Sequence, residues 1–158
     1  MSTASAGGSQ ASARVRELLE AMVDALDVDG DVTIEEDEET VRGMVEGDDL
    51  GVLIGRHGQT IDALEHLAVR VAFRDATERK RVVIDAAGYR GRRAEALERQ
   101  AERAASEALR FGRPVALDAM VASERRLVHE FLRDRHDVET YSEGEEPDRH
   151  LVVAPVVS

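Results

Sequence analysis

The residues best suited to chemistry form a loop in which two glycines flank an arginine and a histidine, Gly55-Arg56-His57-Gly58. Glycine backbone can approach a phosphate closely, and a helix that starts directly after the loop presents free N–H groups to an anion. Arg56 adds a permanent positive charge and His57 a titratable donor. Ile54, which offers an apolar surface for bases, and Gln59 flank the loop. The pattern predicts a clamp for the backbone of an unpaired nucleic acid strand.

The loop has two other interpretations besides the clamp. In the first interpretation, the two glycines serve as a helix cap and a turn and have no role in binding. A loop for nucleoside triphosphates is excluded because no Gly-Lys-Ser/Thr follows, so the lysine and the Mg²⁺-binding hydroxyl of such loops are both missing.

A second candidate site lies on a predicted helix over 118–134, where Arg125 and His129 are four residues apart and share a face. A cation and an imidazole on one face can grip a phosphate and hydrogen-bond a sugar or base, with Arg126 beside them. The alternative is that Arg125 pairs with a nearby glutamate and that His129 is a half-buried structural residue. The acidic turn at 143–148 supplies carboxylates that can hold Arg125, Arg126 or Arg149.

The distribution of charge is compatible with a local polyanion site in the middle of the chain, although the chain as a whole is acidic. The 158 residues carry a net charge of −12, but residues 51–113 carry a net +4, against −11 for 1–50 and −5 for 114–158. Within the basic segment, Arg90, Arg92 and Arg93 are candidates for electrostatic support of RNA. Aromatic residues make up only 3% of the chain, so recognition by stacking several bases on rings is not expected.

Several function classes are excluded or disfavoured by composition. The chain has no cysteine, which excludes disulfides and thiolate metal sites. Its five histidines show no zinc-hydrolase spacing, and no nucleophile motif is present, so we expect no metal, no cofactor and no enzymatic activity. The first ten residues do not form a signal peptide and no apolar run is long enough to span a bilayer. We expect a cytoplasmic protein with no transmembrane segment.

The elements that must position these residues follow from hydrophobic periodicity. After a disordered tail (1–11), a helix over 12–27, a hairpin over 32–45, a short helix ending near Ile54, a helix over 59–74 and a strand over 79–86 give the order α-β-β-α-α-β. A second module contains the helices 89–111 and 118–134 and strands at 115–117, 138–142 and 149–154. The chain is therefore predicted to be an α+β protein with domains at 12–87 and 88–156, joined by the long helix.

Taken together, these motifs resemble the Jag family of bacterial RNA-binding proteins, also called KhpB or EloR. The matching stretches are Leu53 to Leu64, Gly88-Tyr89-Arg90 with Arg92-Arg93, Glu124 to Glu130, and Ser142 to Pro147 with Arg149. The resemblance implies a type II KH domain followed by a small α/β R-three-H domain, named for an arginine and a histidine separated by three residues. It implies binding of single-stranded RNA, post-transcriptional regulation linked to cell elongation or division, and a heterodimer with a small KH-only protein. Family members often carry a further N-terminal domain, which we do not expect here.

A protein–protein adaptor of a cell-envelope assembly, with RNA binding incidental, is the alternative function. The net charge of −12 is its main support, because an acidic surface repels nucleic acid.

Overall fold

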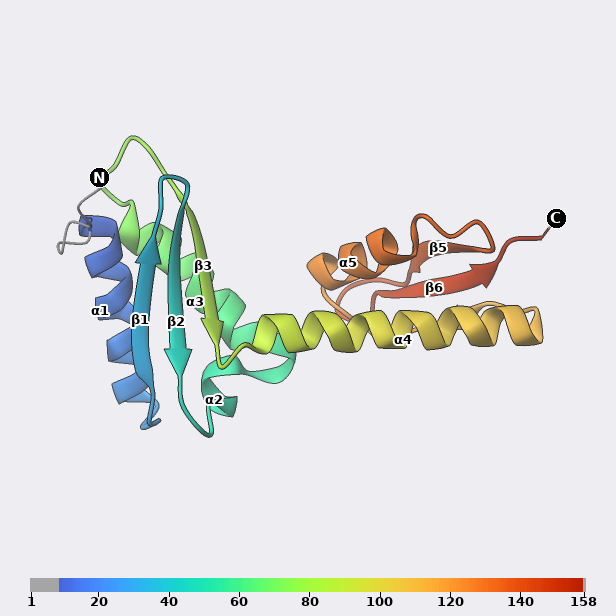
Figure 1. Ribbon diagram of the computed structural model, residues 1–158, viewed down its shortest axis with the longest axis horizontal. Coiled ribbons are helices and arrows are strands. Elements are labelled where there is room, and N and C mark those ends of the chain that lie inside the picture. The colour runs from blue at the N-terminus through green and yellow to red at the C-terminus, as the bar shows by residue number, and fades with distance from the viewer. Residues whose placement is uncertain (1–8, 158) are drawn as a thin grey trace, which may run out of the picture. The chain divides into compact units, whose positions relative to one another are not determined.

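The computed structural model describes residues 9–157 and divides into two compact units. The first unit ends at Arg90 and the second begins at Gly91, in the first turn of helix α4 (Tyr89–Phe111). Figure 1 shows the elements of each unit. The predicted α+β class and the order α-β-β-α-α-β of the first unit are confirmed.

The first unit opens with helix α1 (Gln10–Ala25), which starts two residues before the predicted position. The Ser9 side chain accepts a hydrogen bond from the Ser12 N–H and caps the helix. Gln10 and Ala11 are therefore helical rather than part of the predicted tail, and residues 1–8 of that tail lie outside the described part of the chain.

A three-stranded sheet in the order β1-β2-β3 forms the rest of the first core. Strands β1 (Asp31–Glu36) and β2 (Thr40–Glu46) are antiparallel, and β3 (Arg81–Ala86) runs parallel to β2. Helices α1 and α3 (Gln59–Ala72) cover one face, behind the strands in Figure 1. A Cβ at Gly43 would lie 2.6 Å from Leu19 Cδ1, so glycine lets α1 pack closely on β2.

The segment between β2 and α3 positions the glycine loop. It consists of the short helix α2 (Gly51–Ile54) and a single 3₁₀ turn, η1 (Arg56–Gly58), which leads directly into α3. Leu53 and Ile61, on either side of the loop, are fully buried. Both ends of the loop are thereby anchored in the core of the first unit.

The second unit packs helices α4 and α5 (Ala122–Leu132) with an antiparallel sheet in the order β4-β6-β5. Its strands are β4 (Val115–Ala116), β5 (Val138–Glu143) and β6 (His150–Pro155). Helix α5 is shorter than the predicted 118–134 because Val121 is extended, with φ −67° and ψ 160°. Leu97, Val128 and Val153 are central to the core. Leu109, which periodicity assigns to the buried stripe of α4, is 40% exposed.

No helix within residues 9–157 has the length and apolar character needed to cross a membrane. The same part of the chain contains no group of three or more histidine, aspartate or glutamate side chains placed to hold a metal ion.

Candidate nucleic-acid interface

The glycine loop has a backbone that only glycine accommodates at its first position. Gly55 has φ +75°, and a Cβ there would lie 2.2 Å from Thr60 Oγ1 and 2.8 Å from the Thr60 backbone nitrogen. Gly58 also has a positive φ, +78°, and a Cβ there would lie 2.7 Å from the Tyr89 ring. His57 adopts the left-handed region as well, with φ +54°. The loop is therefore a compact turn pressed against the start of α3.

The two residues between the glycines face solvent. Arg56 and His57 are exposed, as is Gln59, whereas Ile54 and Gly55 are half-buried and Gly58 is buried. Neither Arg56 nor His57 forms an ion pair within the described residues. At the start of α3, Gly58 provides no side-chain cap for the first-turn N–H groups. The loop thus joins a free cation, an imidazole and uncapped amides, which is a chemistry suited to phosphate.

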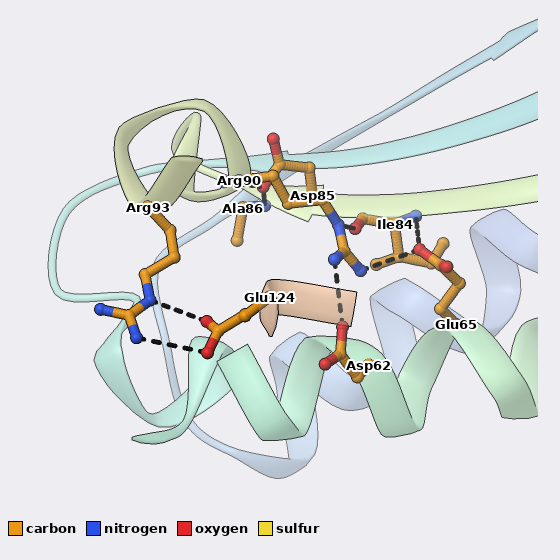
Figure 2. A network of polar contacts seen from close by, with 8 residues as sticks. All are labelled: Asp62, Glu65, Ile84, Asp85, Ala86, Arg90, Arg93 and Glu124. Carbon is orange, nitrogen blue, oxygen red and sulfur yellow. Dashed lines mark hydrogen bonds and ion pairs between the residues drawn. The ribbon is translucent and has the colours of Figure 1, made fainter. Parts of the chain in front are cut away.

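Arg90 has a different environment from the one expected of an RNA contact. Its Nε donates to the Ile84 carbonyl over 2.8 Å, and its two terminal nitrogens bind Asp62 at 3.0 Å and Glu65 at 2.8 Å (Figure 2). Glu65 in turn accepts from the Ile84 N–H over 3.0 Å. The outward N–H and C=O of Ile84 on edge strand β3 are therefore both satisfied by side chains, which protects this edge.

This network also changes the electrostatics of the glycine loop. Asp62 lies in the first turn of α3, and Glu65 lies one turn further on. Unpaired carboxylates at these positions would repel a phosphate at the start of the helix. Because Arg90 is bound to both, its single positive charge offsets one of their two negative charges.

Arg93 forms a bidentate ion pair in the second unit. Its Nε and one terminal nitrogen contact the two carboxylate oxygens of Glu124 at 2.8 and 3.3 Å (Figure 2). The side chain of Glu124 is only 10% exposed, so this pair is largely shielded from solvent. It connects α4 to the first turn of α5. Arg92, between the two paired arginines, is exposed.

The arginine of the Arg-x₃-His pair is buried. Arg125 donates to the Met120 carbonyl over 2.5 Å and forms an ion pair with Glu146 at 2.9 Å. The predicted pairing of Arg125 with the acidic turn at 143–148 is confirmed, whereas Arg149 instead donates to the Gly144 carbonyl over 2.7 Å. Arg125 thus fixes the hairpin tip against the start of α5.

The remaining candidates on α5 are accessible. Arg126 and His129 are both exposed. His129 Nδ1 is within hydrogen-bonding distance of Thr140 Oγ1 on β5, which holds the ring beside the sheet. Arg125 and His129 lie on the same helix, as their spacing predicts. In the structure, however, Arg125 is buried and only His129 is exposed to solvent.

The sequence does not indicate which carboxylates pair with Arg90 and Arg93. Asp62, Glu65 and Glu124 lie between 25 and 31 residues from the arginines they bind. Charged residues are frequent here, 34% of the chain, so no local signal distinguishes a binding carboxylate from a solvated one.

Comparisons with known proteins agree with this architecture. Residues 12–84 match the family model for the KhpA/KhpB KH domain, and residues 95–155 match the family model for the R-three-H domain. The chain therefore contains a KH domain of the KhpA/KhpB type followed by an R-three-H domain. It is 39% identical over 140 residues to the RNA-binding protein KhpB of Clostridium symbiosum, covering 87% of this chain and 63% of that protein. It is 36% identical over 138 residues to the RNA-binding protein KhpB of Bacillus subtilis, covering 86% of this chain and 66% of that protein.

A third relative, the RNA-binding protein KhpB of Lactiplantibacillus plantarum, is 45% identical over 104 residues, 66% of this chain and 32% of that protein. The chain therefore spans just under two thirds of the length of the first two relatives and about one third of the third.

Proposed function

We propose that this protein binds unpaired RNA without altering it chemically, and that the 55–58 loop is the principal contact. The observation that carries the proposal is the exposed Arg56–His57 pair between two glycines of positive φ, directly before the uncapped start of α3. The names of the relatives, RNA-binding protein KhpB, support the same ligand. A KH loop of this form clamps about four backbone nucleotides.

We further propose that the second unit contributes a weaker contact through Arg126 and His129, the two exposed candidates on α5. Two weak sites on one chain raise the apparent affinity when a single strand reaches both. Arg90, Arg93 and Arg125 are assigned structural roles, because carboxylates and backbone carbonyls already occupy their guanidinium groups. Arg92 remains a candidate for electrostatic support.

The test replaces the two residues inside the loop and leaves the glycines in place. A side chain at Gly55 would collide with Thr60, so a glycine variant would confuse misfolding with loss of binding. Arg56→Asp with His57→Asp keeps the backbone and places negative charge where phosphate should bind. We expect the affinity for a fluorescein-labelled oligouridine to fall by about tenfold or more, with a shallower dependence on salt.

A matched control is available beyond the other end of α3. Thr77→Asp with Arg79→Asp changes the charge by the same amount when His57 is neutral, and both residues are exposed in the loop before β3. Helix α3 has 14 residues, so this loop is separated from the glycine loop by about 21 Å. The control should retain most of the affinity. Equal losses in both variants, or no RNA binding by the unaltered protein, would contradict the proposal.

For the cell, we propose a cytoplasmic post-transcriptional regulator linked to cell elongation or division, acting with a small KH-only protein as heterodimer partner. The family resemblance supports this role. Crosslinking in cells followed by RNA sequencing tests it, because a protein–protein adaptor of the cell envelope would recover no RNA above background.

A further inference from the structure

Two arginine side chains lie over the ring of Phe111, at the carboxyl end of α4. The guanidinium carbons of Arg110 and Arg113 each lie 5.3 Å from the centre of the ring. The ring is 55% exposed, and both arginines are exposed. Aromatic rings attract a guanidinium at this distance, which limits its rotational freedom. These three side chains form an ordered cationic surface, here called the helix-end corner.

The end of the helix explains why the corner forms. Gly112 has φ +63°, and the Arg113 N–H donates to the Ala108 carbonyl over 3.2 Å. This is a Schellman motif, in which a left-handed glycine turns the chain back over the last helical turn. Arg113 is thereby returned to the side of Phe111. The corner is built by local backbone geometry.

The charge of the corner is uncompensated. Arg110 and Arg113 have no carboxylate at ion-pair distance within the described residues, whereas Arg90, Arg93 and Arg125 are all paired. In a chain of net charge −12, two unpaired arginines three residues apart are a marked local concentration of positive charge.

A hollow of about 440 Å³ lies beside the corner on α4. Its lining residues are Glu102, Arg103, Ser106, Glu107, Arg110 and Phe111. Of its two carboxylates, Glu102 is already bound to Arg135 at 3.1 Å. Glu107 is therefore opposed by Arg103 and Arg110 in the hollow, with Arg113 at the adjoining corner, so the balance favours an anionic ligand.

We propose that the helix-end corner is a further RNA contact, in which Arg110 and Arg113 bind phosphate oxygens of an unpaired strand. Phe111 holds the two guanidinium groups in place, which reduces the entropy lost on binding. The inference rests on the proposed function, because it assigns another part of the chain to the same ligand. It also modifies the expectation from composition: one of the few aromatic residues serves RNA binding by ordering cations rather than by stacking bases.

The test uses the full chain and a fluorescein-labelled oligouridine, titrated at several salt concentrations. Each phosphate contact on a single strand contributes about 0.7 to the slope of log affinity against log salt. Arg110→Ala with Arg113→Ala should therefore reduce the slope by about 1.4 and lower affinity by up to about 25-fold near 0.1 M salt. Phe111→Leu, which keeps both charges but removes the ring, should lower affinity by a smaller factor.

The matched control is Arg99→Ala with Arg133→Ala. Both arginines are exposed on helices of the same unit or directly after them, and neither has an ion pair within the described residues. The control removes the same charge and should retain most of the affinity. Far-UV circular dichroism checks that each variant is folded, since cations at a helix end also stabilise the helix.

The outcomes separate this inference from the proposed function. A loss confined to the corner variants supports the inference. Equal losses in the Arg99/Arg133 control would show a general charge effect and overturn it. Loss of binding in the Arg56/His57 variant with none at the corner would also overturn it, while the proposed function would stand. If the unaltered chain binds no RNA, both fail. A change in oligomeric mass for Phe111→Leu, with RNA affinity unchanged, would identify a protein contact instead.

Discussion

Replacing Arg90 by alanine distinguishes a residue that touches RNA from one that organises the site indirectly. The substitution removes three hydrogen bonds, to the Ile84 carbonyl, Asp62 and Glu65. It leaves two carboxylates of α3 without their cation. We therefore expect two separate effects, one on the stability of the first unit and one on RNA affinity.

The stability effect follows from the exposure of the groups. The side chains of Arg90, Asp62 and Glu65 are 36%, 44% and 33% exposed, so each ion pair is screened and contributes about 0.5 kcal/mol. The charged donor on the Ile84 carbonyl contributes about 1 kcal/mol. The sum is about 2 kcal/mol, which corresponds to roughly 30-fold faster exchange of the Ile84 amide hydrogen when exchange follows opening of the edge.

The affinity effect is smaller and electrostatic. Two carboxylates at roughly 10 Å from a bound phosphate each oppose binding by about 0.4 kcal/mol in water before salt screening. Screening at 0.1 M salt reduces this further. Arg90→Ala should therefore weaken RNA binding by about twofold or less under conditions in which the variant is folded.

The decisive variant combines Arg90→Ala with Asp62→Asn and Glu65→Gln. Removing the carboxylates removes the repulsion, so RNA affinity should return at least to that of the unaltered protein although stability does not. Hydrogen exchange measured by NMR reports the stability, and fluorescence anisotropy reports the affinity. If the triple variant remains as weak as Arg90→Ala, Arg90 contacts RNA directly and the reasoning is wrong.

Two further predictions concern the ion pairs that hold each unit together. Burial alone raises the pKa of the Glu36 carboxyl, but hydrogen bonds from Ser9, Ser12 and Lys80 outweigh it and hold that pKa below its ordinary value. Since the folded pKa is depressed, Glu36 stabilises the fold above its unfolded pKa and loses this contribution as the pH falls through its folded pKa. The difference in unfolding free energy between the unaltered protein and Glu36→Gln should therefore shrink on acidification, and a difference that stays constant from neutral to acidic pH would refute this. Arg125→Ala should destabilise the second unit by about 2 kcal/mol, because it removes a buried charged donor from the Met120 carbonyl and the partner of Glu146. Thermal unfolding measures the loss, and unchanged stability with reduced RNA affinity would return Arg125 to the RNA contacts.

The order of elements in the first unit followed from sequence because each element has its own local signal. The alternation of Val41, Gly43 and Val45 predicted β2, and the buried face of that strand is the one formed by these residues. The predicted helix boundaries were less accurate where the residue before the first turn determines the start of the helix. Ser9 begins α1 earlier than hydrophobic spacing indicated, and the extended Val121 delays α5.

The composition of the candidate site was less predictable than its location. The 55–58 loop could be singled out because two glycines three residues apart have a direct conformational meaning, and the structure gives both a positive φ. The expectation that Arg90, Arg92 and Arg93 give electrostatic support to RNA rested on their charge and on the family resemblance. Charge identifies the residues that can bind an anion. It does not show which of them already form an ion pair with a carboxylate of the same chain.

The sequence alone determined the two modules, the glycine loop and the Arg-x₃-His spacing, because these depend on contacts between residues close along the chain. Only the tertiary structure decided that Arg90, Arg93 and Arg125 are occupied while Arg56, Arg110 and Arg113 have no carboxylate partner within the described residues. The reason is physical: a guanidinium pairs with whichever carboxylate the fold brings within about 3 Å. That partner lies far away in sequence, where no local pattern specifies it.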